Sequence, residues 1–292
     1  LMLHKKRCIF FLCLIAFSTL FAEGPRRKKL ELPGADSPLT KKYRDNYLTD
    51  AGRKWLREVL YNSAPYRPYI RAQLKKRRLP MILQYLPIVE SDYKVHAVSK
   101  SGAAGMWQFM ENSMSPYLKK NYWYDERFDP WKETDAALSK LADNYKMFGD
   151  WSFALAAYNM GAGAISRTIK EHQGKTYWNL AENGDIRSQT AMYVPKLLAV
   201  ADIIENAEYY GLIDIGAIDK MIEGKAPEQY SYLRITGKIS LSEIAAATGI
   251  DLETLIFLNP ALLHECTPSK ETYRLRLPYG SAKKAAEDLK RR

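Results

Sequence analysis

The 292-residue sequence has few of the residues that build metal centres and disulfide frameworks. Two of its three cysteines, Cys8 and Cys13, lie in an apolar N-terminal run, and the third is Cys266. If that run is removed, no internal disulfide can form, and the fold must depend on its hydrophobic core. The four histidines have no spacing that would hold a metal ion; they are His4, His96, His172 and His264. We therefore predict neither a metal nor a cofactor.

Motifs of several enzyme classes are also missing. There is no Gly-x-Ser-x-Gly, and no Lys-Thr-Gly accompanies a Ser-x-x-Lys, so serine acyl transfer has no support. No glycine loop that would hold phosphate groups is present. The net charge of +11 indicates an anionic partner, yet the basic residues are dispersed and match no base-reading motif, so we expect no nucleic acid. A cell wall that carries carboxylates fits better, and a basic surface without a specific partner is the alternative.

Residues 1–22 have the pattern of a secretory signal peptide. Basic residues 5–7 precede an apolar run over residues 8–21, and Ala22 is a small residue at a plausible cleavage point. The run is short for a membrane span, but an uncleaved segment would anchor the protein to a membrane. Small residues do not precede Cys13 as they would at a lipidation site. We therefore expect an exported protein of the periplasm or cell envelope.

Residues 79–110 hold the candidate catalytic stretch. An apolar helical run over residues 81–89 leads into a single acid, Glu90. Burial disfavours the ionised carboxyl and raises its pKa, as a general acid near neutral pH requires. Glu90 is therefore the candidate proton donor, although a surface cap or ion-pair partner is the commoner role of such a residue. A polar loop and then Trp107 and Gln108 follow, and we expect helix, cleft-lining loop and second helix.

Five short motifs follow one another along residues 87–196. They are PIVES, SxxGAAGMWQFM, DERFDP, AAYNMG and YVPK. This set resembles the signatures of lytic transglycosylases, which are bacterial enzymes of the goose-type lysozyme superfamily. It is most similar to the membrane-bound lytic murein transglycosylase D type. The resemblance extends over about residues 39–212.

The resemblance implies roles for particular residues. Ser91 and Gln108 would bind and orient the substrate near the acid, while Tyr158, Asn159 and Tyr193 would hold the muramyl unit and its N-acetyl group. Taken alone, each is more often a structural polar residue than a ligand contact. One position departs from the subgroup, which often carries Glu four residues before the tyrosine of YVPK; this chain has Gln there, and we leave that position out of the site.

The activity implied is cleavage of the MurNAc-β-1,4-GlcNAc bond of peptidoglycan in wall remodelling or turnover. Glu90 would protonate the glycosidic oxygen and then act as base while the C6 hydroxyl of the sugar attacks, leaving a 1,6-anhydro end. The sequence offers no convincing second acid beside the motifs, because Asp92 lies two residues from Glu90 and should face elsewhere on a helix. A lysozyme-type hydrolase of the same bond and a non-catalytic peptidoglycan-binding protein remain as alternatives. We expect a monomer whose partner is the glycan strand.

The expected fold is mainly α, with a lysozyme-like helical catalytic domain followed by a small α/β module of order β-α-α-β. The latter resembles a LysM module, although residues 236–239 replace its usual Gly-Asp-Thr loop. Aromatic residues cluster over residues 117–131, where sugar stacking and core packing both remain possible. The expected divisions are signal peptide 1–22, mobile basic linker 23–38, catalytic domain 39–212, linker 213–229, LysM-like module 230–279 and basic tail 280–292.

Overall fold

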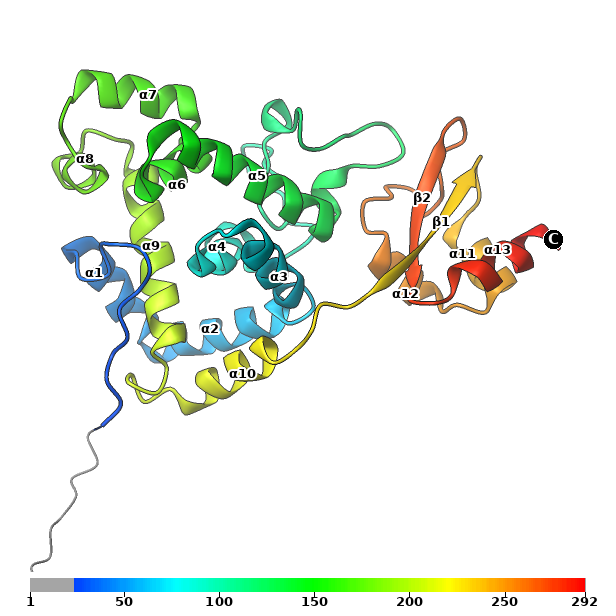
Figure 1. Cartoon of the computed structure of the whole chain (residues 1–292), viewed down its shortest axis with the longest axis horizontal. Coiled ribbons are helices and arrows are strands. Elements are labelled where there is room, and N and C mark those ends of the chain that lie inside the picture. Colours follow the sequence, from blue (N-terminus) through cyan, green and yellow to red (C-terminus); the bar gives the residue numbers. More distant parts are fainter. Residues whose placement is uncertain (1–23, 292) are drawn as a thin grey trace, which may run out of the picture.

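The computed structural model describes residues 24–291, so the predicted signal peptide over residues 1–22 lies outside the described residues. Figure 1 shows a large helical part and a smaller C-terminal part that contains both strands. No helix among residues 24–291 has both the length and the apolar character needed to span a bilayer. The helices of the larger part are α1 (Pro38–Tyr47), α2 (Asp50–Ser63), α3 (Arg67–Arg77), η1 (Met81–Tyr85), α4 (Leu86–Ser91), η2 (Glu111–Ser113), η3 (Glu126–Phe128), α5 (Pro130–Phe148), α6 (Trp151–Met160), α7 (Ala162–Glu171), α8 (Tyr177–Asn183), α9 (Ser188–Glu205) and α10 (Ile213–Glu223).

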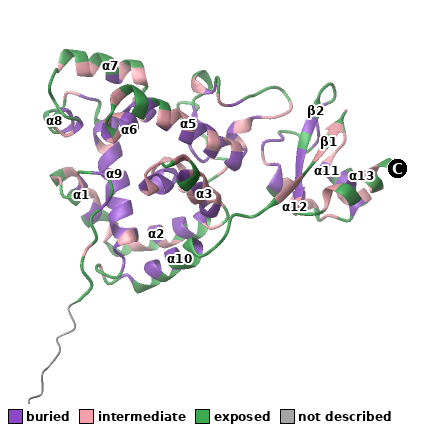
Figure 2. Ribbon diagram, in the orientation of Figure 1, coloured by how far each residue is buried: buried purple, intermediate pink, exposed green. Residues whose placement is uncertain are grey.

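Helix α9 forms the centre of the larger part. Most of its side chains from Thr190 onward are buried, and Figure 2 shows the helix buried along most of its length. A helix that is apolar on every side is stable only when other elements surround it. Helices α1, α4, α6 and α8 pack against α9 and provide that surrounding. The short helix that carries Glu90 therefore lies against the most buried element of the fold.

Glu90 lies in the last turn of α4, after a break in the apolar run. The run begins as the 3₁₀ helix η1, and α4 starts anew at Leu86. Pro87 lacks the N–H that would continue the preceding hydrogen-bond ladder, which explains the break. The prediction of a second helix after the loop is wrong. Instead, Ala104 and Phe109 exchange two backbone hydrogen bonds of 3.0 Å, which close a tight turn.

The N-terminal segment is not the mobile linker that its composition predicts. Its described residues run along the larger part, where Leu30 and Leu32 are buried in the main core. The Nε of Arg27 lies 2.9 Å from a carboxylate oxygen of the fully buried Asp202. Two buried leucines and a paired buried charge hold this segment in place, so the linker prediction for residues 23–38 is wrong over the described residues.

The linker predicted for residues 213–229 is also wrong over Ile213–Glu223, which form α10. Ile215, Ile218 and Ile222 lie on one face of this helix and are buried in the main core. Gly216, Gly224 and Pro227 suggested a linker, but the spacing of the isoleucines at i, i+3 and i+7 is the stronger signal. The remaining residues, 224–229, connect α10 to the smaller part (Figure 1).

The smaller part confirms the predicted order of strand, two helices and strand. Leu233 of one strand pairs with Leu275 of the other in an antiparallel register. Its first helix begins with a Ser240–Glu243 capping box, which satisfies free N–H groups at the helix start. The elements are β1 (Tyr230–Thr236), α11 (Leu241–Thr248), α12 (Leu252–Leu258), β2 (Thr272–Pro278) and α13 (Ala282–Lys290).

The tail predicted over residues 280–292 instead forms α13 over most of its length. Ala285 is buried and Leu289 packs against the core of the smaller part, together with residues from β2 and α11. Apolar residues four positions apart lie on one helix face, which explains why this charged segment packs on the module. The predicted division into a mainly α domain and a small α/β module is confirmed.

The two parts meet through the segment that precedes α5. Asp125 donates its backbone N–H to the carbonyl of Ala261 at 3.0 Å, and Leu263 donates to the carbonyl of Trp123 at 2.9 Å. These bonds pair the backbone of the large part directly with that of the small part. The C-terminal module is therefore docked on the larger part, not merely tethered to it.

A buried ion pair strengthens this junction. Arg276 of β2 places Nη2 3.0 Å from a carboxylate oxygen of Asp129, the residue that caps the N-terminus of α5. The guanidinium also lies 4.1 Å from the centre of the Trp131 ring. Trp131 and Tyr124 of the aromatic cluster contact rings of the smaller part, which favours packing over sugar stacking for these two residues.

Candidate active site

The cavity beside Glu90 has a volume of about 280 Å³ and collects most of the predicted site residues. It is bounded by the end of α4, the loop after it, and helices α5, α6 and α9. No residue of the aromatic cluster 117–131 lines it. Its lining consists of Val89, Glu90, Ser99, Ser101, Ala103, Gln108, Met110, Ser113, Lys140, Tyr158, Asn159, Gln189, Tyr193 and Lys196.

Glu90 has the protonation behaviour that a general acid needs. Burial raises the pKa of its carboxyl to about 7, although a hydrogen bond from Tyr193 and the charge of Lys140 both act in the opposite direction. Desolvation dominates because the ionised form loses its water without gaining a direct cationic partner. The carboxyl is therefore largely protonated below neutral pH and loses its proton around neutral pH.

Tyr193 fixes the orientation of that carboxyl. Its hydroxyl donates a short hydrogen bond to Oε1 of Glu90, and the tyrosine itself is only 4% exposed. The ring is held by the buried helix α9, while Glu90 is held by α4. Two elements far apart in the sequence thus set the position of the one acid in the cavity lining.

The turn after Gly105 is the second organising feature of the site. Gly105 has φ +90°, and a Cβ placed on it would lie 1.9 Å from the carbonyl oxygen of Arg127 and 2.3 Å from Oε1 of Glu133. Only glycine allows this approach. Because the chain can come so close, Trp107 donates its backbone N–H to Glu133 at 3.0 Å.

Ser91 and Tyr158 hold the other side of this turn. The hydroxyl of Ser91 donates to the carbonyl of Met106 at 2.8 Å, and that of Tyr158 donates to the carbonyl of Trp107 at 2.9 Å. Tyr158 still lines the cavity with its ring, whereas Ser91 is not among the lining residues. The hydroxyls of both residues therefore position the turn, and Ser91 is the one predicted site residue that the structure leaves outside the cavity.

Gln108 and Asn159 face the cavity and are held by hydrogen bonds of their own. Gln108 has φ +54°, and its Nε2 donates to the carbonyl of Gly105 at 2.9 Å. Asn159 accepts a hydrogen bond from Thr190 at its Oδ1, at 2.8 Å. Since its oxygen is engaged, the amide nitrogen of Asn159 is the group with donors left for a further hydrogen bond. Both amides thus have set orientations before any substrate is bound.

The sequence interpretation missed several residues of the site. Glu133 is fully buried, and burial raises the pKa of its carboxyl well above the usual value. Glu133 lies three and four positions before Ala136 and Ala137 on the buried face of α5, so helical periodicity could have predicted that it is buried. Lys140 lines the cavity, but only the packing of α5 brings it there. Gln189, which was left out of the site because it departs from the subgroup, also lines the cavity.

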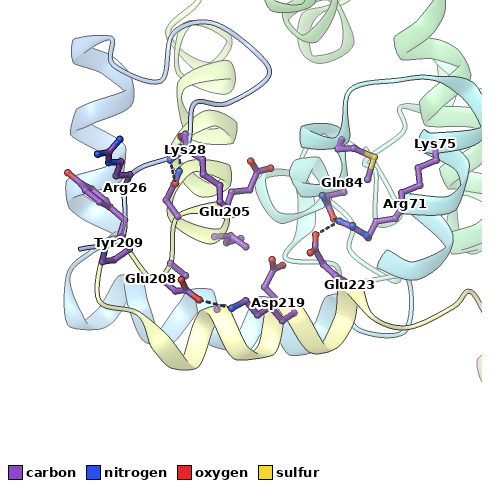
Figure 3. Close-up of a pocket in the computed structure, with 17 residues that line it drawn as sticks. Arg26, Lys28, Arg71, Lys75, Gln84, Glu205, Glu208, Tyr209, Asp219 and Glu223 are labelled. Atoms are coloured by element: carbon purple, nitrogen blue, oxygen red, sulfur yellow. Dashed lines mark hydrogen bonds and ion pairs between the residues drawn. The ribbon is translucent and has the colours of Figure 1, made fainter. Parts of the chain in front are cut away.

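A larger cavity of about 420 Å³ lies elsewhere and shares no lining residue with the cavity of Glu90. Figure 3 shows charged side chains of both signs around it. Arg71 and Glu223 form an ion pair of 2.5 Å, and Lys220 and Glu208 form one of 2.6 Å. Because these charges neutralise one another and no residue of the five motifs lines the cavity, the smaller cavity is the candidate active site.

Two separate segments of the chain match models of known protein families. A family model described as "Transglycosylase SLT domain" matches residues 67–181, and one described as "Lytic transglycosylase MltD, LysM-like domain" matches residues 229–291. The first segment contains the Glu90 stretch and the Tyr158–Asn159 pair but ends before Tyr193.

Two curated relatives match the chain over a longer stretch than either family model. "Membrane-bound lytic murein transglycosylase D" of Escherichia coli strain K12 is 35% identical over 213 residues, which cover 71% of this chain and 45% of that protein. The protein of the same name from Escherichia coli O6:H1 strain CFT073 gives the same values. The chain thus spans less than half the length of these relatives. The resemblance inferred from the five motifs is confirmed. Residues 67–181 belong to the transglycosylase SLT domain family, and residues 229–291 to the LysM-like domain family of lytic transglycosylase MltD.

Proposed function

We propose that the chain is a peptidoglycan lytic transglycosylase that cleaves the MurNAc-β-1,4-GlcNAc bond and leaves 1,6-anhydro-MurNAc ends. The observation that carries this proposal is a cavity with one acid in its lining, Glu90, whose pKa is raised to about 7. A proton donor of that pKa is suited to the protonation of a poor leaving group at neutral pH. The matched SLT domain supports the same reaction.

In the first step, Glu90 donates its proton to the glycosidic oxygen. An O–H bond forms as the bond between that oxygen and C1 of the muramyl unit breaks, and the GlcNAc unit leaves with a free 4-hydroxyl. C1 becomes electron-deficient and requires a nucleophile. Tyr193 orients the Glu90 carboxyl throughout, because its hydrogen bond needs no reorganisation when the proton leaves the other oxygen.

The second step needs no carboxylate beyond Glu90. Among the described residues, Asp92 is engaged by Nε1 of Trp55 at 3.0 Å, and Glu133 is engaged by Trp107; neither lines the cavity. A glycosidase that uses water or a covalent intermediate places a second carboxylate at the reacting carbon. The C6 hydroxyl of the same sugar can attack C1 in its place, with its proton returning to Glu90. An internal nucleophile has a high effective molarity, so the second acid is dispensable.

The remaining residues would hold the muramyl unit in the cavity. We propose that Gln108 and Asn159 bind its polar groups through their amides, and that the ring of Tyr158 forms an apolar wall. The orientation of both amides by protein hydrogen bonds supports this role. For Ser91 we propose a positioning role through the carbonyl of Met106, because its hydroxyl is already donated.

Mass spectrometry of purified peptidoglycan tests the reaction. Digestion with the full chain should release anhydromuramyl products, and digestion with Glu90→Gln should release none. Reducing muramyl ends from the unaltered protein would identify a hydrolase instead. Absence of cleavage across substrates and pH would favour the wall-binding alternative, and activity that survives in Glu90→Gln would mean that another group is the acid.

We also propose that the protein acts in the cell envelope on glycan strands, as a monomer, with the LysM-like module as a second glycan contact. The name of the E. coli relatives includes the word "membrane-bound", and the net charge of +11 suits an anionic wall. Cell fractionation tests the location, and sedimentation of the purified protein tests the oligomeric state. Recovery from the cytoplasm would refute the envelope assignment.

A further inference from the structure

Two lysines line the Glu90 cavity, and neither forms an ion pair within the part of the chain that the structure describes. Lys140 comes from α5 and Lys196 from α9, and both are half-buried. Among the described residues, the side chain of Lys140 forms one hydrogen bond, from Nζ to the hydroxyl of Ser113 at 3.1 Å. Glu90 is the sole acid in the cavity lining. The described cavity thus has two cationic groups for a single carboxyl.

Aromatic rings hold both ammonium groups without neutralising them. Nζ of Lys140 lies 5.2 Å from the ring centre of Phe109 and 5.1 Å from that of Tyr158. Nζ of Lys196 lies 5.4 Å from the ring centre of Tyr43. A ring face attracts a cation electrostatically but carries no net charge. The two positive charges therefore remain at the cavity and are restrained there.

The charge balance of the occupied cavity depends on the substrate. When Glu90 carries its proton, as the first step requires, the lining has two positive charges and no negative one. A half-buried ammonium group that has lost water is stabilised by an anion nearby more than an exposed one would be. An uncharged glycan would leave both charges uncompensated, whereas a strand with a carboxylate beside the muramyl ring would pair with them.

We infer that Lys140 and Lys196 form a carboxylate-binding subsite, which selects glycan strands with a carboxylate at or beyond the 3-O-lactyl group of the muramyl unit. This inference rests on the proposed function and specifies which strands the enzyme prefers. The carboxylate has two chemical sources. A muramyl unit without peptide has a free lactyl carboxylate, whereas in a substituted unit that group is an amide and the stem peptide supplies its own carboxylates.

Kinetics on three matched substrates test the subsite in the full-length protein. The strands either keep their stem peptides, lack them after amidase treatment, or lack them and have each lactyl carboxyl converted to a neutral methylamide. For the unaltered protein, the KM for the methylamide strands should be about tenfold higher than the lower of the two KM values for the strands that carry a carboxylate. This ratio corresponds to about 1.4 kcal/mol. Equal KM values for all three substrates would overturn the inference.

Substitutions of the lysines identify their part in that preference. Lys140→Met and Lys196→Met should each raise KM severalfold for the strands that carry the recognised carboxylate, while the KM for the methylamide strands should stay the same. The arginine substitutions should restore KM, and Lys146→Met, an exposed position on the same helix, is the control. A KM increase confined to peptide-free strands identifies the lactyl carboxylate, and one confined to peptide-bearing strands identifies the peptide.

Lys140 has one alternative role, because its charge also lowers the pKa of Glu90. If that were its whole function, Lys140→Met would change kcat equally on all three substrates, shift the basic limb of the pH profile upward, and leave KM unchanged. That result would overturn the subsite.

Strand affinity in the Glu90→Gln background separates the subsite from the reaction. Titration calorimetry on this inactive protein should show a loss of about tenfold for carboxylate strands when both lysines are replaced by methionine. If the unaltered protein makes no anhydro ends while this loss is seen, the proposed reaction fails and the subsite stands. If anhydro ends form and affinity does not depend on the lysines, the subsite fails and the reaction stands.

Discussion

Replacement of Arg276 by methionine is a direct test of the docked arrangement of the two parts. The ion pair with Asp129 is nearly inaccessible, with 5% and 4% of the two side chains exposed. Nη1 of Arg276 also donates to the carbonyl of Leu258 at 2.8 Å. Arg276→Met keeps much of the apolar volume but leaves the Asp129 carboxylate buried without its cation.

The expected loss in the free energy of unfolding is large. Removal of one partner from a buried ion pair costs about 3–5 kcal/mol, because the other charge stays desolvated. Asp129→Asn should cost a similar amount by leaving Arg276 unpaired, although asparagine still caps α5 as well as aspartate does. The double substitution should cost less than the sum of the two single ones by at least about 1 kcal/mol, because the pair acts as a unit.

Equilibrium urea unfolding, followed by tryptophan fluorescence and circular dichroism, measures these losses. The matched control is Arg274→Met two residues away on β2, where an exposed guanidinium lies 3.8 Å from the centre of the Tyr232 ring. An exposed contact of that kind is worth about 0.5–1 kcal/mol. If Arg276→Met costs no more than Arg274→Met, the guanidinium is solvated in solution, and the docking of the module is refuted.

Three further predictions concern the active site. The pH profile of kcat/KM should fall above about pH 7 as Glu90 loses its proton. The hydrogen bond from Tyr193 lowers the Glu90 pKa, so Tyr193→Phe should raise that pKa and move the fall to higher pH. An unchanged profile would contradict the assignment of this fall to Glu90. Gly105→Ala should lower the free energy of unfolding by at least about 2 kcal/mol and abolish cleavage. Gly102 has a similar positive φ, but a Cβ added to it would have no atom within 4 Å, so Gly102→Ala should lower the free energy of unfolding by only about 1 kcal/mol. Equal losses would mean that the chain around Gly105 moves to accept the added methyl group. Finally, the free energy of unfolding should fall as the pH rises from 4.5 to 7, because Glu90 and Glu205, both with a pKa of about 7, bind protons more tightly in the folded protein than in the unfolded chain. Glu90→Gln should make this fall with pH less steep. An unchanged pH dependence in that variant would contradict the raised pKa of Glu90.

Local patterns in the sequence were enough to predict the apolar surroundings of the Glu90 carboxyl. An apolar run that ends in one acid indicates a carboxyl at the edge of a core, and the structure gives this carboxyl a raised pKa. The Ser240–Glu243 capping box and the final Gly249 likewise mark both ends of α11 by local chemistry. Features of this kind depend on residues within a few positions of one another, so the sequence alone contains the signal.

Features that depend on tertiary packing could not be predicted in this way. From the sequence, the hydroxyl of Ser91 could be interpreted as a group that binds a ligand. The fold places the carbonyl of Met106 2.8 Å from this hydroxyl, which donates its hydrogen bond there. Lys140 is one of 44 basic residues, and no local pattern distinguishes it before α5 packs beside α6. The isoleucine spacing of α10, in contrast, was present in the sequence, and Gly216, Gly224 and Pro227 were given too much weight.

The docked module also affects how truncated forms of this protein should be interpreted. A chain cut within residues 224–229 would leave Trp131 and Tyr124 without their partners in the smaller part and would leave Asp129 without a counter-charge. Newly exposed aromatic surface promotes self-association, and a helix whose capping carboxylate has lost its counter-charge is less stable. Reduced turnover by such a fragment would therefore report insolubility or a displaced α5, and could not be attributed to lost glycan affinity. Point substitutions on the outer face of the module are the sounder way to measure what it binds.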